Sequence, residues 1–154
     1  MNDIVMDARL QFFELDEKQQ AALRAAKPIL ERSIGPALDR FYARARITPE
    51  TARFFRDEAH IASAHSAQVR HWMHIVEGDF DADYVKSVRR IGEVHARIGL
   101  EPRWYIGGYS LILEEIIRAV AHATPAWRRL LGIGPNRTEL TVALTKAAMI
   151  DMEM

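Results

Sequence analysis

The fold of this chain is decided by IGEVHARIGLEPRWYIGGY, the stretch at residues 91–109. At about 3.6 residues per turn, its first half forms a helix whose apolar face carries Ile91, His95 and Ile98. Apolar residues upstream extend this face, so His95 lies near its centre. A buried imidazole needs a partner, because an unpaired buried polar group costs about 1–3 kcal/mol. Two interpretations stay open: a satisfied core histidine, or a ligand to a metal or haem iron.

The composition excludes several classes of protein. The chain has 154 residues, 49% of them hydrophobic, which fits one domain with a single core. Basic and acidic residues number 21 each, and this balance gives no support to a nucleic-acid or anionic-membrane partner. The absence of cysteine excludes disulfides, thiolate ligands and covalent haem attachment. Without a signal peptide or a long apolar run, we expect a cytoplasmic protein without membrane or nucleic-acid partners.

Helical periodicity dominates, and it predicts one all-α domain of about seven or eight helices. Asp16 starts a helix, and Ser33 is a plausible cap for a separate one that tolerates Pro36 in its first turn. A short helical turn carries Phe54 and Phe55. The expected helices span residues 3–13, 16–31, 33 to about 47, 57–77, 82–98, 102–122 and 137–154, with loops at 124–125 and 132–135.

A second histidine faces inward by the same periodicity. His65 lies on an apolar stripe with Val69 and Trp72. The other histidines of that helix fall on the opposite side and are expected to be solvated: His60, His71 and His74. His71 and His74 could chelate a surface metal, but no third ligand with suitable spacing is evident.

Inward histidines on two helices, together with Tyr42 and the paired aromatics Phe54 and Phe55, indicate a pocket for a flat, apolar, iron-bearing ligand. The number and lengths of the helices also suit a globin. The pair Gly107-Gly108 within a predicted helix indicates close approach of another backbone or a ligand.

The chain resembles the sensor globins, which are the haem domains of globin-coupled sensors, and the related protoglobins. The resemblance lies in EVHARIGL at residues 93–100 and WYIGGY at 104–109, supported upstream by RFY at 40–42 and the inward Trp72. It covers about residues 16–154 and leaves 1–15 as an N-terminal extension. It implies a single domain at residues 1–154, a globin fold, and haem b between a distal and a proximal helix.

The resemblance also implies roles for individual residues. His95 matches the proximal ligand of haem iron, and Tyr42 matches a distal tyrosine that donates a hydrogen bond to bound ligand. Tyr105 matches a tyrosine close to the proximal histidine. The other expected cofactor contacts are His65, Phe41, Phe55, Val69, Trp72, Ile91, Ile98 and Tyr109.

His65 departs from the family pattern, in which Leu or Thr commonly occupies the inward distal position. Three alternatives stay open: His65 ligates the iron opposite His95, it acts as a second distal hydrogen-bond donor beside Tyr42, or it turns away. In the first case dioxygen would have to displace His65, which would lower the apparent affinity.

The resemblance implies a sensor that binds dioxygen or another diatomic gas reversibly. An enzyme that uses the haem for dioxygenase or peroxidase-like chemistry is not expected, because nothing in the sequence supplies a separate acid–base pair. Such domains usually dimerise through their last two long helices, here residues 102–122 and 137–154. The closing residues LTKAAMIDMEM remain in helical register, so we expect the native chain to continue beyond residue 154 into an output module. The alternative is a haem-free, globin-fold module that acts as a dimeric interaction or signalling part.

Overall fold

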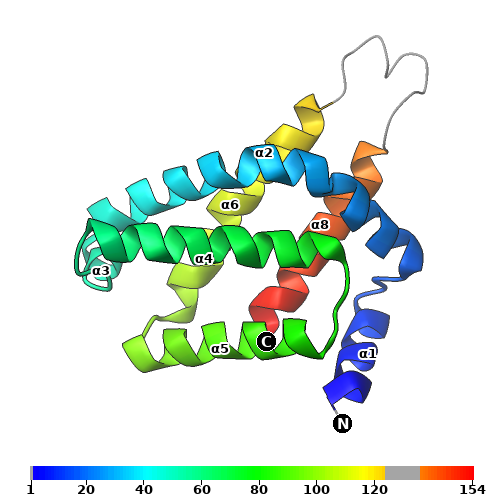
Figure 1. Ribbon diagram of the computed structural model, residues 1–154, viewed down its shortest axis with the longest axis horizontal. Coiled ribbons are helices and arrows are strands. Elements are labelled where there is room, and N and C mark those ends of the chain that lie inside the picture. Colours follow the sequence, from blue (N-terminus) through cyan, green and yellow to red (C-terminus); the bar gives the residue numbers. More distant parts are fainter. Residues whose placement is uncertain (1, 124–135) are drawn as a thin grey trace.

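Helices make up all the regular structure of residues 2–123 and 136–154, the part of the chain that this computed structural model describes (Figure 1). They are α1 (Asn2–Phe12), α2 (Glu17–Ile47), α3 (Pro49–Ala52), α4 (Glu58–Glu77), α5 (Ala82–Ile98), α6 (Pro102–His122) and α8 (Arg137–Glu153). This confirms the predicted all-α class. The loops predicted at 124–125 and 132–135 lie outside the described residues. None of the described helices is both long and apolar enough to cross a membrane.

Side-chain caps explain where the long helices begin. Asp16, Asp57, Asp81 and Asn136 each accept a hydrogen bond from a backbone N–H in the first turn of the helix that follows. The helix that carries His95 ends at Gly99, whose φ of 70° lies in the left-handed region that glycine adopts without steric cost. The predicted boundaries of α4, α5 and α6 are therefore confirmed within a residue.

The predicted break before Ser33 is wrong, because α2 runs unbroken through Pro28 and Pro36. Ser33 does not cap a new helix; its hydroxyl donates to the carbonyl of Ile29, one turn earlier, at 3.0 Å. A proline inside a helix costs about 3 kcal/mol. Here the packing of α2 against α4, α6 and α8 outweighs that cost. Phe54 and Phe55 follow α3 rather than lie within it.

The core lies where α2 crosses α4, α6 and α8 (Figure 1). Its largest fully buried side chains include Leu30 of α2, Trp72 of α4, Ile116 of α6 and Leu144 of α8. These helices form the frame against which α5 is held.

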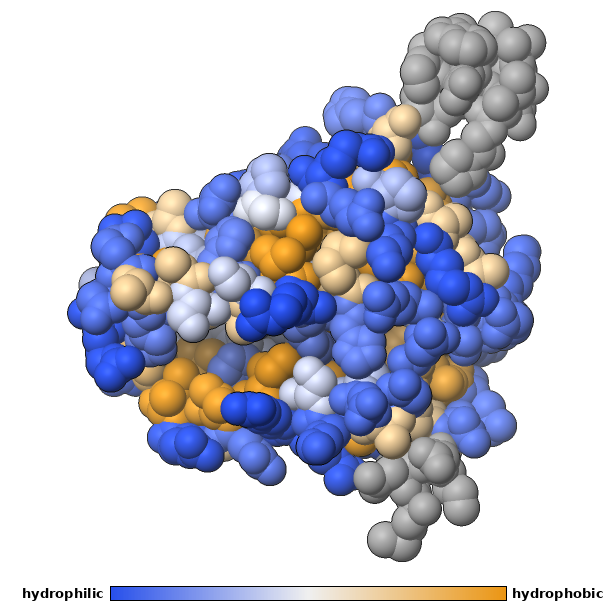
Figure 2. Space-filling view, in the orientation of Figure 1, coloured by the Kyte–Doolittle hydropathy of each residue, from blue (hydrophilic) through white to orange (hydrophobic). Residues whose placement is uncertain are grey.

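Only the first half of α5 is buried against this frame. Tyr84, Val85 and Val88 are buried, whereas Val94 and Ile98 are 43% and 42% exposed. Figure 2 shows apolar surface exposed at this end of α5. The helix that carries His95 therefore stands partly clear of the core.

Candidate functional site

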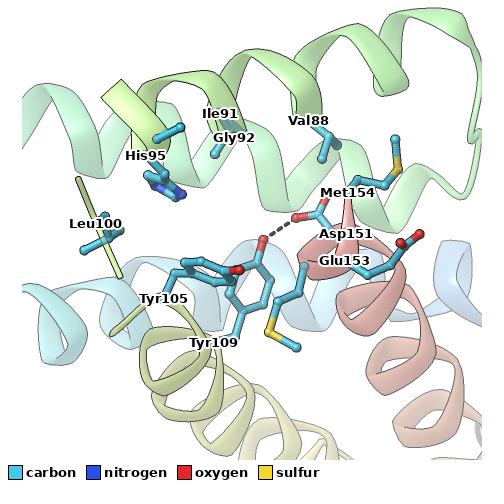
Figure 3. A pocket seen from close by; sticks show the side chains of 12 residues that line it. Val88, Ile91, Gly92, His95, Leu100, Tyr105, Tyr109, Asp151, Glu153 and Met154 are labelled. Atoms are coloured by element: carbon cyan, nitrogen blue, oxygen red, sulfur yellow. Dashed lines mark hydrogen bonds between the residues drawn. The ribbon is translucent and has the colours of Figure 1, made fainter. Parts of the chain in front are cut away.

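A cavity of about 300 Å³ opens between α5, α6 and the end of α8 (Figure 3). Four of the predicted cofactor contacts line it, namely Ile91, His95, Tyr105 and Tyr109. The end of α8 closes it with Asp151 and the residues that follow. Side chains from three separate segments of the sequence therefore meet at His95.

His95 points from α5 into this cavity, toward Tyr105 and Tyr109 of α6 (Figure 3). Its ring stacks on that of Tyr105, with the centroids 6.0 Å apart and the planes 12° from parallel. Neither ring nitrogen hydrogen-bonds to any described residue. Burial lowers the pKa of His95, which favours the neutral imidazole with a free lone pair. Such an imidazole is available as a metal ligand.

Tyr42 of α2 is buried among aromatic rings and does not line the cavity. Its ring centroid lies 4.8 Å from that of Phe41, 5.7 Å from Phe55 and 6.0 Å from His65. Within the described part of the chain, its hydroxyl has no hydrogen-bond partner. Burial raises the pKa of Tyr42 to about 12, so the phenol keeps its proton and remains a donor at neutral pH.

His65 of α4 faces α2 in this structure. Its Nε2 lies 3.1 Å from a carboxylate oxygen of Asp39 and 3.4 Å from the carbonyl oxygen of Gly35. Both neighbours are acceptors, so Nε2 carries a proton toward them. The nitrogen is therefore engaged with α2, while the ring still neighbours that of Tyr42.

Three further predicted contacts, Trp72, Val69 and Ile98, do not line the cavity. Trp72 is 1% exposed, and its ring centroid lies 5.7 Å from that of Tyr109, which lines the cavity. Its indole N–H finds no hydrogen-bond partner in the described residues. Val69 packs against the core, and Ile98, expected to face inward, is exposed at the free end of α5. The cavity itself does not include Tyr42 or His65.

The glycine pair was predicted to allow close approach of another backbone or a ligand, whereas the structure shows close approach of an aromatic side chain, and at one glycine only. A Cβ atom on Gly108 would lie 2.8 Å from Cε2 of Phe41, whereas a Cβ on Gly107 would meet nothing within 4 Å. Gly108 therefore lets the ring of Phe41 lie directly on α6, next to Tyr42.

Comparison with known proteins assigns the family. The protoglobin family model matches residues 4–154, nearly the whole chain. The chain belongs to the protoglobin family. The predicted resemblance to sensor globins is thereby confirmed.

Solved structures of the family confirm the globin fold. The globin domain of the Geobacter sulfurreducens globin-coupled sensor matches this protoglobin with a TM-score of 0.82, at 18% identity, over 96% of this chain and 93% of that one. The ferrous globin domain of E. coli DosC matches with a TM-score of 0.70, also at 18% identity, over 96% of this chain and 97% of that one.

One curated relative is a much longer protein. The heme-based aerotactic transducer HemAT of Halobacterium salinarum is 26% identical over 114 residues. The match covers 73% of this protoglobin but 23% of the transducer. The chain therefore spans about a quarter of the length of this relative.

The structure also reveals a buried polar cluster that the sequence analysis missed. His71, predicted to be solvated, is 5% exposed, because α8 packs against that side of α4. Its Nε2 lies 2.9 Å from the carboxylate of Asp151, which is 4% exposed. Tyr84 and Tyr109 donate to the same carboxylate. The hypothesis of a surface metal at His71 and His74 finds no support, since no group of three possible ligands occurs in the described residues.

Proposed function

We propose that this protoglobin domain binds haem b without a covalent link and senses dioxygen through it. The observation that carries the proposal is the imidazole of His95, which faces the cavity and has no hydrogen bond to any described residue. A neutral imidazole whose nitrogens are not engaged by the protein is free to bind a metal ion.

The residues around His95 fit a flat, largely apolar macrocycle. Val88, Ile91 and Leu100 provide apolar walls, and the aromatic rings of Tyr105 and Tyr109 face them. The chain has no cysteine, so the group would be held by His95 and by packing alone.

Haem, when bound, would supply an iron atom that takes a nitrogen ligand from the protein and binds a diatomic gas reversibly. His95 would supply the protein ligand, and its lowered pKa keeps the nitrogen lone pair free. The stacked ring of Tyr105 would fix the orientation of the imidazole.

Tyr42 of α2 would favour dioxygen over other gases. Its hydroxyl is a donor without a partner, and it keeps its proton because its pKa is about 12. Such a donor favours a gas that carries partial negative charge when bound over a less polar one such as carbon monoxide. The position of His65, with Nε2 toward Asp39, supports the role of a neighbour to Tyr42 better than that of a second iron ligand.

The name of the relative from Halobacterium supports a role in signalling rather than storage or catalysis. We propose that the native chain continues into an output module and dimerises through α6 and α8. Ligand binding can shift such a system only if its two states differ in affinity for the ligand. The domain would be cytoplasmic and would act without a catalytic reaction of its own.

Haem titration of the purified protein tests the proposal. The wild type should show a Soret band that saturates at one haem per chain. His95→Ala should lose stable binding, because no other residue in the cavity offers an imidazole. His122→Ala is the matched control, since His122 is exposed at the end of α6, and it should bind as the wild type does.

The haem-free signalling module is the competing function, and the same titration decides it. A wild-type protein that is folded but develops no Soret band would favour that module. A His95→Ala variant with a normal haem spectrum would remove His95 as the ligand.

A further inference from the structure

Asp151 lies at the meeting point of four helices. It belongs to α8, and its carboxylate accepts hydrogen bonds from His71 of α4 at 2.9 Å, Tyr84 of α5 at 2.8 Å, and Tyr109 of α6. Figure 3 shows the bond from Tyr109 at the edge of the cavity. The carboxylate is 4% exposed, so protein donors replace water around it.

The direction of these bonds is fixed by chemistry. Burial and the charge of Asp151 raise the pKa of both Tyr84 and Tyr109 well above the ordinary value, so both phenols remain donors. An ionised carboxylate only accepts hydrogen bonds. An amide in its place would turn an N–H toward groups that already donate. The cluster therefore depends on the carboxylate and not only on the space it fills.

Two of the donors are rigidly connected to the surroundings of His95. Tyr84 lies about three helical turns before His95 on α5. Tyr109 lies one turn after Tyr105, on whose ring the imidazole stacks. A shift or rotation of α5 that moves His95 therefore also moves Tyr84. A shift of α6 that moves Tyr105 also moves Tyr109, and both tyrosines are hydrogen-bonded to Asp151.

The bond from Tyr84 joins α5 directly to α8. Apart from this bond, α5 packs chiefly against α1 and α4. A change in the position of α5 can therefore be passed to α8 at Asp151 more directly than through apolar packing.

We propose that Asp151 is a positioning residue that couples the state of the cavity at His95 to the end of α8. The inference rests on the proposed function, because it takes haem as the group that fills the cavity. A ligand that fills the cavity would fix the positions of α5 and α6. The three hydrogen bonds to Asp151 would then fix the position of the end of α8.

Hydrogen exchange of the backbone amides of α8, measured with and without haem, tests this coupling. In the wild type, haem should slow exchange around Asp151 by about fivefold or more, a coupling of ordinary size between two sites. Asp151→Asn has nearly the same shape, and in its haem-bound form the effect of haem on the exchange of α8 should disappear. Asp79→Asn, at an exposed position outside the cluster, should behave as the wild type does.

Tyr84→Phe serves as the second variant if Asp151→Asn does not fold. It removes one donor and leaves the bonds from His71 and Tyr109 in place. It should bind haem and lose most of the protection that haem gives to α8. If Tyr84 and Asp151 had only a structural role, each substitution would change the exchange rates of α8 equally with and without haem. The difference between the haem-bound and haem-free protein would then persist.

The outcomes separate the two proposals. If the wild type binds haem and both variants keep the full haem-dependent protection of α8, the coupling role of Asp151 is overturned while the haem site stands. If the wild type shows no Soret band, the proposed function fails and the coupling to haem fails with it.

Discussion

At the scale of single residues, His95 combines a half-buried ring with the lack of a hydrogen bond. Burial lowers its pKa below the ordinary value of about 6.5. As the pH falls below about 6.5, the imidazole of His95 takes up a proton in the unfolded chain more readily than in the folded protein. The free energy of unfolding contributed by this group is therefore complete above about pH 6.5 and falls as the pH falls.

In the haem-free protein, His95→Leu should remove this loss of unfolding free energy at acidic pH. Urea denaturation between pH 5 and pH 7.5 would measure it, because the wild type should lose more free energy of unfolding over this range than the variant. His122→Leu, at an exposed position, should keep the wild-type slope. Equal slopes in wild type and His95→Leu would contradict the assignment of a buried, unpaired imidazole.

Tyr42 should control the residence time of dioxygen and have little influence on folding. Tyr42→Phe removes a hydroxyl that has no partner in the described residues, so the free energy of unfolding at pH 7 should change little. Loss of a hydrogen bond worth about 1.4 kcal/mol would raise the dioxygen dissociation rate about tenfold. Stopped-flow displacement of dioxygen measures the rate, and an unchanged value would show that Tyr42 does not donate to the ligand.

The sequence could predict that these two residues face inward, because each lies on the apolar stripe of a helix. It could not predict the orientation of His65, because Asp39, which faces it, lies on another helix. The periodicity of α4 shows which of its faces is buried, but not which side chain on a neighbouring helix each polar residue contacts. The partner of each polar side chain depends on how the helices cross.

At the scale of secondary structure, α6 packs against Phe41 at Gly108. Gly108→Ala would place a Cβ 2.8 Å from that ring, and overpacking of this kind costs about 1–3 kcal/mol. Gly107→Ala is the matched control on the neighbouring position, where a Cβ meets nothing within 4 Å. It should stabilise the protein by about 0.5–1 kcal/mol, because alanine favours a helix over glycine.

Denaturation midpoints of the two glycine variants check this prediction. They should move in opposite directions from the wild type. Equal shifts would show that Phe41 yields without cost and that the close contact with α6 is not specific.

The end of α8 shows what helical spacing could and could not reveal. Leu140, Leu144, Ala147 and Asp151 follow one another at helical intervals, so the buried stripe of α8 leads to a carboxylate. This spacing is a signal in the sequence for a buried, satisfied Asp151. It does not name the donors, which come from α4, α5 and α6. The continuity of α2 through Pro36 was likewise decided by packing rather than by local preference.

At the scale of the whole molecule, the fold could be predicted because α2, α4, α5 and α8 begin at a capping residue, α6 begins at Pro102, and the long helices bury an apolar face. The globin architecture was predicted from the resemblance around His95 and is confirmed by the family model and the solved structures. The cavity brings together residues of α5, α6 and α8 that are far apart in the sequence, from Val88 to Met154. Arrangements of this kind follow from packing of the complete chain.

The central claim is that this domain holds haem at His95 with an open site for dioxygen. The most direct measurement is the absorption spectrum of the haem-reconstituted protein in the ferrous state, before and after exposure to dioxygen. We predict one broad visible band without gas, which marks an open axial site, and two resolved bands after dioxygen is added, with reversal when the gas is removed. Two sharp bands before the gas is added would show that His65 or another side chain occupies the second axial position. No Soret band in the folded protein would contradict the account.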